Sequence, residues 1–368
     1  MKIVITGSDG FIGRNLVVRL QEADLHELRP LGRDADPATF SASIADADFV
    51  FHLAGVNRTP DEREFVAGNV EATEHLCRAL DSAGNRAPIV YASSTQATLD
   101  NVYGRSKRAA EDALVRHGDA TGAPVTIFRL TNVFGKWAKP NYNSAVATFC
   151  HNVANGLPIT VHDPAATLRL LYIDDVLDAF VGMLDAPAEG AGFRVATPVY
   201  ETTVGEVADI ICGFAKVRKS LVIPPVGTGL VRALYSTYLT YLPPAAFDYE
   251  VAVHSDPRGD FVEMLKTADS GQFSYFTAGP GVTRGNHYHH TKAEKFLVIS
   301  GTAHFGFRHV VTGESHELVV RGGEGKIVET IPGWTHNITN VGEEQLIVML
   351  WANEIFDRQR PDTIAMKV

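Results

Sequence analysis

The sequence predicts an α/β domain built on a doubly wound parallel sheet, followed by a smaller all-β sandwich or barrel. Up to about residue 200, short apolar runs alternate with longer stretches of helical period, which is the pattern of a parallel sheet with helices on both faces. From about residue 250 helical signals nearly vanish, and short apolar runs follow one another between glycine turns. The length of 368 residues also exceeds what one hydrophobic core usually organises.

Each element is assigned from its own stretch of sequence. The strands of the first domain are expected at "KIVITG", "ADFVFHLAG", "APIVYASS" and "APVTIFRL". A last helical stretch covers residues 204–217, and proline pairs at 224–225 and 243–244 then interrupt the pattern. The strands of the second domain are expected at "QFSYFTAG", "EKFLVISG", "AHFGFRHV", "HELVVRGG", "GKIVETIPG" and "EQLIVMLWANE". We therefore expect the two domains to occupy residues 1–244 and 245–368.

The composition favours a small-molecule partner and a reducing compartment. The 33 Lys and Arg against 43 Asp and Glu give a net charge of −10, which argues against binding to nucleic acid or to an anionic membrane. Cys77, Cys150 and Cys212 are widely spaced and form no Cys-x-x-Cys pair, so neither a disulfide framework nor a thiolate metal site is expected. No apolar run approaches the roughly 18 residues that span a bilayer, and the first residues lack a signal cleavage site. These observations predict a soluble, cytoplasmic protein.

A glycine-rich turn follows the first expected strand. Gly7, Gly10 and Gly13 form G-x-x-G-x-x-G, and glycines there permit a tight turn and let a pyrophosphate approach the N-terminus of the next helix. The pattern predicts a Rossmann-like dinucleotide site, although a glycine turn that only packs helix against strand would look the same. The residues expected to contact the cofactor, here and at the end of "FHLAG", are Gly7, Ser8, Asp9, Gly10, Phe11, Ile12, Gly13, Arg14, Leu53, Ala54 and Gly55.

The stretch "YGRSK" places Tyr103 and Lys107 four residues apart, on one face of a helix. A tyrosine with a pKa of about 10 is rarely ionised at pH 7, and an adjacent cation can lower that pKa by about 1 to 3 units, which makes a usable proton relay. Ser94 or Thr95, at the end of the preceding strand, would hydrogen-bond the reacting oxygen, and Lys107 would also hold the cofactor ribose. The alternative is a tyrosine and a lysine on a solvated helix face.

These motifs resemble the extended short-chain dehydrogenase/reductase family of nucleotide-sugar epimerases, dehydratases and reductases, over about residues 1–215. The resemblance implies that Asn132 in "FRLTNVFG" contacts the substrate or the nicotinamide, and that Arg169 in "RLLYIDDV" binds the nucleotide diphosphate. Ser94 and Tyr103 are nine residues apart, much closer than is usual in this family. A loop that normally covers the site is therefore missing, and the choice between Ser94 and Thr95 stays open.

The cofactor is expected to be NADP(H). In this fold a carboxylate at the end of the second strand binds the 2′-hydroxyl of NAD, whereas an arginine accommodates the 2′-phosphate of NADP. Here "LRPLGRD" offers Arg33, and Arg14 follows the third glycine of the turn. Arginines that are merely solvated at the surface are the alternative.

The stretch "GNHYHHTKAEKFLVISG" concentrates side chains that bind metals. His287 and His289 would share one face of a strand, Glu294 follows five residues later, and "IPGWTHNITN" adds His336. Three imidazoles and a carboxylate suit Zn, Fe, Mn or Ni. The spacing resembles the two motifs of the cupin family, which implies a jelly-roll barrel and a metal held by these four residues. His290 is offset by one position and would face away, support a ligand from behind, or move a proton.

Two such sites in one chain suggest that both act on one substrate. A proton on a sugar carbon is acidic only beside a carbonyl, so a keto-sugar can be epimerised, and hydride reduction of that carbonyl then fixes the new configuration. The likeness extends through "KWAKPNYNSAVATFC", "LYSTYLTYLPP" and "DPRGDFVEMLK". The whole chain therefore resembles the CapF and WbjC family of capsule and O-antigen proteins.

This second resemblance implies a homodimeric, zinc-containing, bifunctional enzyme on the path to UDP-N-acetyl-L-fucosamine. Its cupin domain would epimerise C3 of a UDP-2-acetamido-2,6-dideoxy-4-keto-hexose. Its reductase domain would then reduce C4 with NADPH, giving UDP-2-acetamido-2,6-dideoxy-L-talose. Two alternatives stay open, namely an epimerase or dehydratase whose cupin only dimerises the protein, and a regulator that binds a sugar nucleotide without turning it over.

Overall fold

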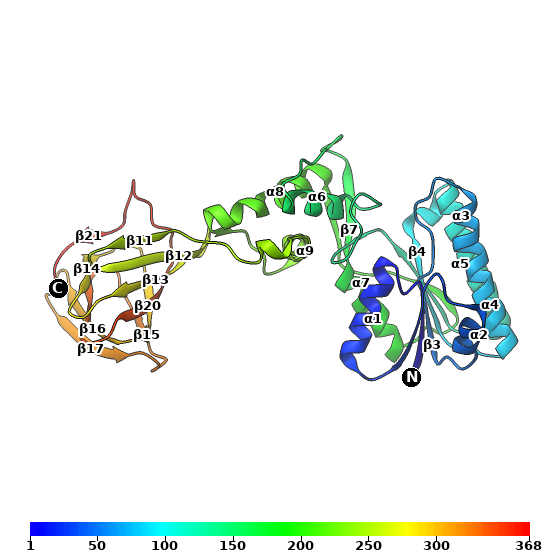
Figure 1. Cartoon of the computed structure of the whole chain (residues 1–368), viewed down its shortest axis with the longest axis horizontal. Coiled ribbons are helices and arrows are strands. Elements are labelled where there is room, and N and C mark those ends of the chain that lie inside the picture. The colour runs from blue at the N-terminus through cyan, green and yellow to red at the C-terminus, as the bar shows by residue number, and fades with distance from the viewer. The chain divides into compact units, whose positions relative to one another are not determined.

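The computed structural model describes residues 1–368, which fold into two compact units (Figure 1). The first unit contains Met1–Cys212 and Arg232–Pro243, and the second contains Gly213–Val231 and Pro244–Val368. None of the helices combines the length and the apolar character that crossing a membrane requires.

The first unit is built on six parallel strands, which confirms the predicted doubly wound sheet. The strands lie in the order β2 (Glu27–Leu31), β1 (Lys2–Thr6), β3 (Phe49–His52), β4 (Ile89–Ser94), β5 (Val125–Leu130) and β8 (Ala191–Arg194). From β1 the chain first moves outward to β2 and then returns to β3 on the other side of β1. The reversal between β1 and β3 is the topological switch point, where α/β sheets place their ligands.

Helices cover both faces of this sheet (Figure 1). On one face, α1 (Phe11–Ala23) packs against α7 (Ile173–Asp185). On the other face, α4 (Ala72–Ala83) contacts both α2 (Pro37–Ala45) and α5 (Val102–Thr121). The short α3 (Arg63–Phe65) and a π-helical turn (Val66–Glu71) lead into α4, and a 3₁₀ turn (Thr95–Thr98) leads from β4 toward α5. Buried side chains of the sheet and of α2, α4 and α5 form one core, which includes Val4, Val50, Leu76, Tyr91 and Leu114.

The remaining elements of the α/β region are a small separate sheet and three helices. The sheet joins β6 (Asn132–Phe134), β7 (Thr167–Tyr172) and β9 (Val199–Thr203), with β7 parallel to β6 and antiparallel to β9. The helices that follow or precede these strands are α6 (Ala145–Ala154), α8 (Val204–Ser220) and α9 (Gly229–Leu239).

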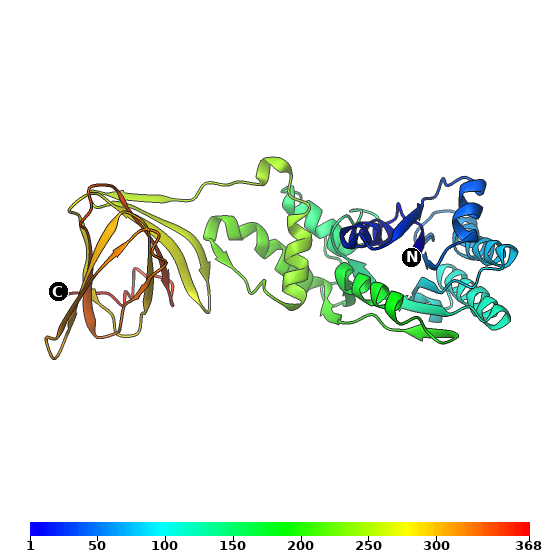
Figure 2. The same ribbon diagram turned by 90° about the horizontal axis from the view of Figure 1, so that it is seen from below.

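The second unit is almost entirely β structure, as the sequence predicted, and its strands surround a common interior (Figure 2). One sheet contains β10 (Val222–Ile223), β11 (Val253–Asp256), β12 (Gly259–Thr267), β13 (Gly271–Ala278), β20 (Leu346–Ala352), β15 (Glu294–Ser300) and β18 (Ile327–Glu329). The other contains β17 (Ser315–Arg321), β16 (Thr302–His309), β19 (Trp334–Asn340), β14 (Thr283–Tyr288) and β21 (Ile364–Ala365). Phe276, Phe296 and Val348 of the first sheet and Phe305 and Ile338 of the second share one apolar core.

The turn after β1 depends on a glycine. Gly7 has a φ of +68°, and a Cβ added to it would lie 2.6 Å from the Ala54 backbone nitrogen. The positive φ and the close approach of the chain after β3 both exclude a side chain at this position. Gly84 offers a comparison, because its φ is +62° but nothing lies within 4 Å of an added Cβ.

We predict that Gly7→Ala lowers the free energy of unfolding by about 2 to 4 kcal/mol, because it adds a backbone clash to the cost of a left-handed alanine. Gly84→Ala, the control, should lose only about 1 to 2 kcal/mol, the cost of the left-handed conformation alone. Urea denaturation of both variants measures the difference. Equal losses would show that β1 and β3 do not constrain the turn.

Candidate functional site

The turn from β1 into α1 presents free backbone amides at the switch point. Gly10 is the N-cap residue of α1 and provides no capping side chain, and the first turn contains no acidic residue. A Cβ added to Gly13 would lie 2.2 Å from the Gly7 carbonyl oxygen, so the helix begins directly against the turn. The amides and the positive end of the helix dipole together favour an anionic group such as a pyrophosphate.

The other residues expected to bind the cofactor lie at the ends of the neighbouring strands. Leu53, Ala54 and Gly55 follow β3 directly, and Asn69 fixes the chain beyond them by accepting from the Val56 amide and donating to the Val56 carbonyl, both at 2.9 Å. Beyond the end of β2, Arg33 is exposed to solvent. Arg14 is also exposed, and its Nη2 donates to the Asp9 carbonyl at 3.3 Å.

Lys107 lies buried beside this edge of the sheet, with 4% of its surface exposed. Its Nζ donates to the Ala92 carbonyl at 2.7 Å and lies 4.3 Å from the centre of the Tyr91 ring. A Cβ added to Gly55 would lie 3.7 Å from this Nζ, so the ammonium group is next to the end of β3. Burial lowers the pKa of Lys107 to about 7, and the charge of Glu111 opposes that effect.

Tyr103 lies one turn before Lys107 on α5, whose N-terminus is capped by the Asn101 side chain. Burial raises the pKa of Tyr103, and a hydrogen bond with the Ser94 side chain opposes the rise. The sequence predicted that a cation would lower the pKa of Tyr103, and that prediction is wrong because burial raises the pKa by more than the hydrogen bond with Ser94 lowers it. Thr95 is exposed and begins the 3₁₀ turn, so Ser94 is the hydroxyl that the structure places with Tyr103.

A buried ion pair that sequence reasoning missed supports this arrangement. Glu111 is 2% exposed, and its carboxylate accepts hydrogen bonds from Nε and Nη2 of Arg129 on β5. The shortest of these contacts is 2.6 Å. The Ser93 hydroxyl donates to the same carboxylate at 2.5 Å. The network ties the end of β4 and β5 to the helix that carries Lys107. The only sequence signal was a glutamate four residues after Lys107.

The two residues expected to bind substrate are neighbours on β6 and β7. Asn132 begins β6, and its Nδ2 donates to the Arg169 carbonyl at 3.2 Å. The Arg169 side chain is exposed, with Nε 3.4 Å from a carboxylate oxygen of Glu201 on β9. Both side chains are therefore available at the surface of the small sheet.

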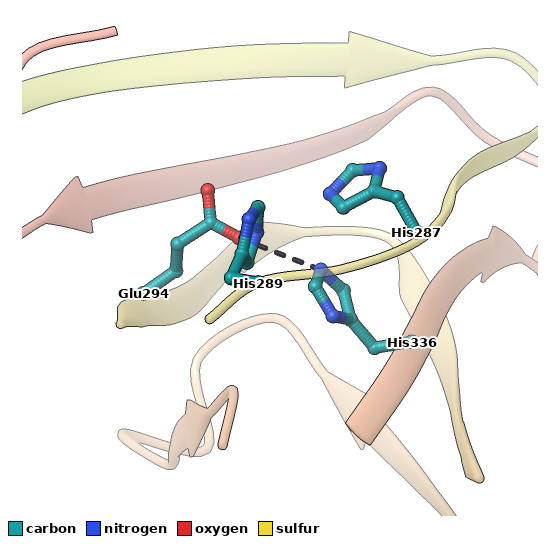
Figure 3. A group of neighbouring side chains, drawn as sticks. All are labelled: His287, His289, Glu294 and His336. Atoms are coloured by element: carbon teal, nitrogen blue, oxygen red, sulfur yellow. Dashed lines mark hydrogen bonds and ion pairs between the residues drawn. The ribbon is translucent and has the colours of Figure 1, made fainter. Parts of the chain in front are cut away.

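In the second unit, the four predicted metal ligands come together (Figure 3). One ligand atom from each of His287, His289, Glu294 and His336 lies within 4.8 Å of the other three. His287 on β14 is directly opposite His336 on β19, because a bulge at Asn286 shifts the register there. His289 follows the end of β14, and Glu294 is the first residue of β15.

The charges in this cluster suit a metal cation. Glu294 Oε2 is 3.3 Å from His289 Nε2 and 3.4 Å from His336 Nε2. Burial alone would raise the pKa of Glu294, but the two imidazoles hold that pKa well below its ordinary value. Burial and the neighbouring histidines lower the pKa of His287 to about 4, which keeps this imidazole neutral and able to ligate. Nδ1 of His336 is buried and has no hydrogen-bond partner in the protein.

Two further residues, His290 and Lys292, lie near the cluster in sequence. His290 is exposed, its ring packs edge-on against Tyr288, and only its backbone amide is held, by Asp362. The structure therefore does not bring His290 among the four ligands. Lys292, which sequence reasoning missed, is buried with its Nζ 3.1 Å from Glu294 Oε1.

Comparisons with known proteins match both units. Residues 3–196 match the NAD dependent epimerase/dehydratase family, and residues 254–364 match the polysaccharide biosynthesis C-terminal domain. The chain is 54% identical over 368 residues to UDP-2-acetamido-2,6-beta-L-arabino-hexul-4-ose reductase from Pseudomonas aeruginosa, covering 100% of this chain and 99% of that protein. It is also similar to the crystal structure of capsular polysaccharide assembling protein CapF from Staphylococcus aureus, with 40% identity, a TM-score of 0.93 and 100% of both chains covered. A UDP-glucuronic acid 4-epimerase from Bacillus cereus in complex with NAD, at 17% identity and a TM-score of 0.55, shares the fold over 66% of this chain and 98% of its own.

We predict that the burial of Lys107 makes stability depend on pH. Between a folded pKa of about 7 and the ordinary value of 10.5, the unfolded chain binds a proton that the folded chain does not, so the free energy of unfolding rises with pH in that window. Between pH 7 and pH 9, the free energy of unfolding of the unaltered protein should rise by about 2 kcal/mol more than that of Lys107→Met.

Urea unfolding of both proteins across this pH range measures the gain, and Lys139→Met, which replaces an exposed lysine, serves as the control. Parallel stability curves for the unaltered protein and Lys107→Met would show that the lysine keeps its ordinary pKa.

Proposed function

We propose a function from the premise that this chain belongs to the NAD dependent epimerase/dehydratase family and, along its whole length, to the family of CapF. The protein is an oxidoreductase that reduces the 4-keto group of a UDP-linked 2-acetamido-2,6-dideoxy sugar with NADPH. Its second domain, of cupin type, first epimerises C3 of the same 4-keto sugar. The product is UDP-2-acetamido-2,6-dideoxy-L-talose, a precursor of UDP-N-acetyl-L-fucosamine for capsule or O-antigen. We keep 1–244 and 245–368 as the two functional domains.

The placing of Ser94, Tyr103 and Lys107 at the carboxyl edge of the sheet carries the proposal for reduction. NADPH, when bound, supplies the hydride that adds to C4. The raised pKa of Tyr103 keeps its phenol protonated at neutral pH, which is the form that donates a proton to the carbonyl oxygen as it becomes an alcohol. Ser94 orients that oxygen, and the Lys107 ammonium stabilises the phenolate left behind.

The surroundings of this site support the choice of cofactor and substrate. The uncapped amides of the turn after β1 would receive the pyrophosphate, and exposed Arg33 and Arg14 would receive the 2′-phosphate of NADPH. Asn132 and Arg169, side by side on β6 and β7, would hold the sugar and the UDP diphosphate. An arginine presents a fork of donors that matches phosphate oxygens.

The four-ligand cluster supports the proposal for epimerisation. His287, His289, Glu294 and His336 would hold a divalent cation, and their nitrogen and oxygen donors fit zinc. A bound cation would supply positive charge to stabilise the enolate oxygen that forms when C3 loses its proton. Return of a proton to the opposite face of C3 completes the epimerisation. Whether His290 moves either proton remains a prediction.

We also propose that the protein acts as a homodimer. The outer face of the larger sheet in the second unit exposes Met264, Tyr275 and Ile299, which surround a cavity of about 400 Å³ together with Phe273, Ile347 and Met349. Exposed apolar side chains gathered on one face of a sheet offer a surface on which another protein chain can pack. A second copy of this chain is the partner that the proposal names.

We predict that Tyr103→Phe slows NADPH oxidation with the 4-keto sugar at least about a hundredfold, because the proton donor is lost while the ring remains. Tyr249→Phe, which removes a phenol from the second unit, should keep the rate of the unaltered protein. The fall in NADPH absorbance at saturating sugar and cofactor measures the rates of both variants. The same assay with NADH measures the preference for NADPH. A Tyr103→Phe enzyme of normal rate would exclude Tyr103 as the proton donor.

We predict that removing the metal separates the two activities. His336→Ala, or treatment with a chelator, should abolish incorporation of solvent deuterium at C3 of the 4-keto sugar, because the cluster that stabilises the enolate is lost. Reduction of sugar already in the epimerised form should continue. His316→Ala, which alters an exposed histidine on β17, is the control.

A thermal melt must accompany this assay, because a site with four protein ligands can also be structural. Deuterium exchange at the normal rate in folded, metal-free protein would rule out catalysis by the cluster.

A further inference from the structure

The last residues of the chain run beside β14, the strand that carries His287 of the metal cluster. We call residues 362–368 the C-terminal strap. Its strand β21 pairs with β14, so that Ala365 is opposite His287 and Ile364 is opposite Tyr288. The Met366 amide also donates to the Asn286 carbonyl at 2.9 Å, and Arg308 on β16 donates to the Lys367 carbonyl at 2.6 Å. The strap is therefore held both by β14, which carries His287, and by Arg308 on β16.

The Asp362 side chain organises the loop between two of the ligands. Its carboxylate accepts hydrogen bonds from the amides of His290 at 2.9 Å, Thr291 at 2.8 Å and Lys292 at 2.9 Å. The Thr291 hydroxyl donates to it as well, at 3.1 Å. These residues are the whole connection from His289 to Ala293, next to Glu294. One carboxylate thus sets the path of the chain from one ligand to the other.

The Asp362 backbone fixes the orientation of His289 itself. Nδ1 of His289 is hydrogen-bonded to the Asp362 carbonyl oxygen, which can only accept, so the ring proton is on Nδ1. With a proton held on Nδ1, His289 can offer a bound cation the lone pair of Nε2, the nitrogen that lies 3.3 Å from Glu294 Oε2. His289 is 2% exposed, so no water competes for its ring nitrogens at the surface. The arrangement is that of a ligating histidine held from behind by a carbonyl.

We infer that Asp362 is a positioning residue for the metal site, and that the C-terminal strap holds His289 and Glu294 in the geometry that binds the cation. This inference rests on the proposed metal dependence of the second domain. Asp362 touches neither cation nor sugar and acts through the loop 290–292 and the His289 ring. Its effect is therefore on metal affinity first, and on epimerisation through the metal.

The test is the zinc affinity of the full-length protein, measured by competition with a chromophoric chelator. Asp362→Asn keeps the shape of the side chain but loses the charge, and it replaces one accepting oxygen by an NH₂ group that faces backbone donors. Zinc should bind about 10 to 100 times more weakly, the usual effect of altering a group that supports a metal ligand. Asp357→Asn, the same change at an exposed aspartate of the preceding segment, should leave the affinity unchanged.

Two further measurements make the result decisive. Asp362→Glu keeps the charge and should recover part of the affinity, and reduction of the epimerised sugar should be normal in both Asp362 variants, which a general loss of folding would not allow. If folded Asp362→Asn binds zinc as tightly as the unaltered protein, the inference is overturned while the proposed function stands. If the unaltered protein itself binds no zinc, the proposed metal dependence is overturned and the inference with it.

Discussion

Strand register is the constraint on which both candidate sites depend. In the first unit, parallel pairing brings the carboxyl ends of β1, β3 and β4 to one edge, so that Gly7, Gly55 and Ser94 lie at the same edge although they are far apart in sequence. In the second unit, antiparallel pairing sets His287 opposite His336, and a bulge at Asn286 gives the chain the extra residue that this alignment requires. A slip of one residue in either sheet would turn the site residues to the opposite face.

Burial then gives these residues their chemical character. Lys107 is desolvated next to a backbone carbonyl, and the Glu111 to Arg129 pair balances charge one turn away. In the metal cluster, Glu294 stays ionised because two imidazoles and Lys292 surround it. Charges this deeply buried are stable only when they are paired, so each site includes a supporting ion pair as well as its reactive groups.

The sequence predicted what local spacing determines. The glycine turn and the pair of Tyr103 and Lys107 are patterns within short segments, and the four ligands come from two such segments, which the structure brings together. Contacts across long separations were missed, because nothing near Glu111 specifies Arg129 and nothing near His289 specifies Asp362. The predicted direction of the change in the Tyr103 pKa was wrong for the same reason. The burial of Tyr103 depends on the whole fold, including Phe65, whose ring packs against that of Tyr103.

In the proposed function, one chain moves a proton at C3 and then a hydride to C4 of the same sugar. The most direct measurement starts from the 4-keto sugar before epimerisation. The unaltered protein converts it in deuterated water with NADPH of ordinary isotopic composition, and mass spectrometry and NMR locate the deuterium in the product. We expect solvent deuterium at C3 of the product and ordinary hydrogen at C4. A reduced product without deuterium at C3 would contradict it, because the sugar would then have been reduced without passing through the epimerisation.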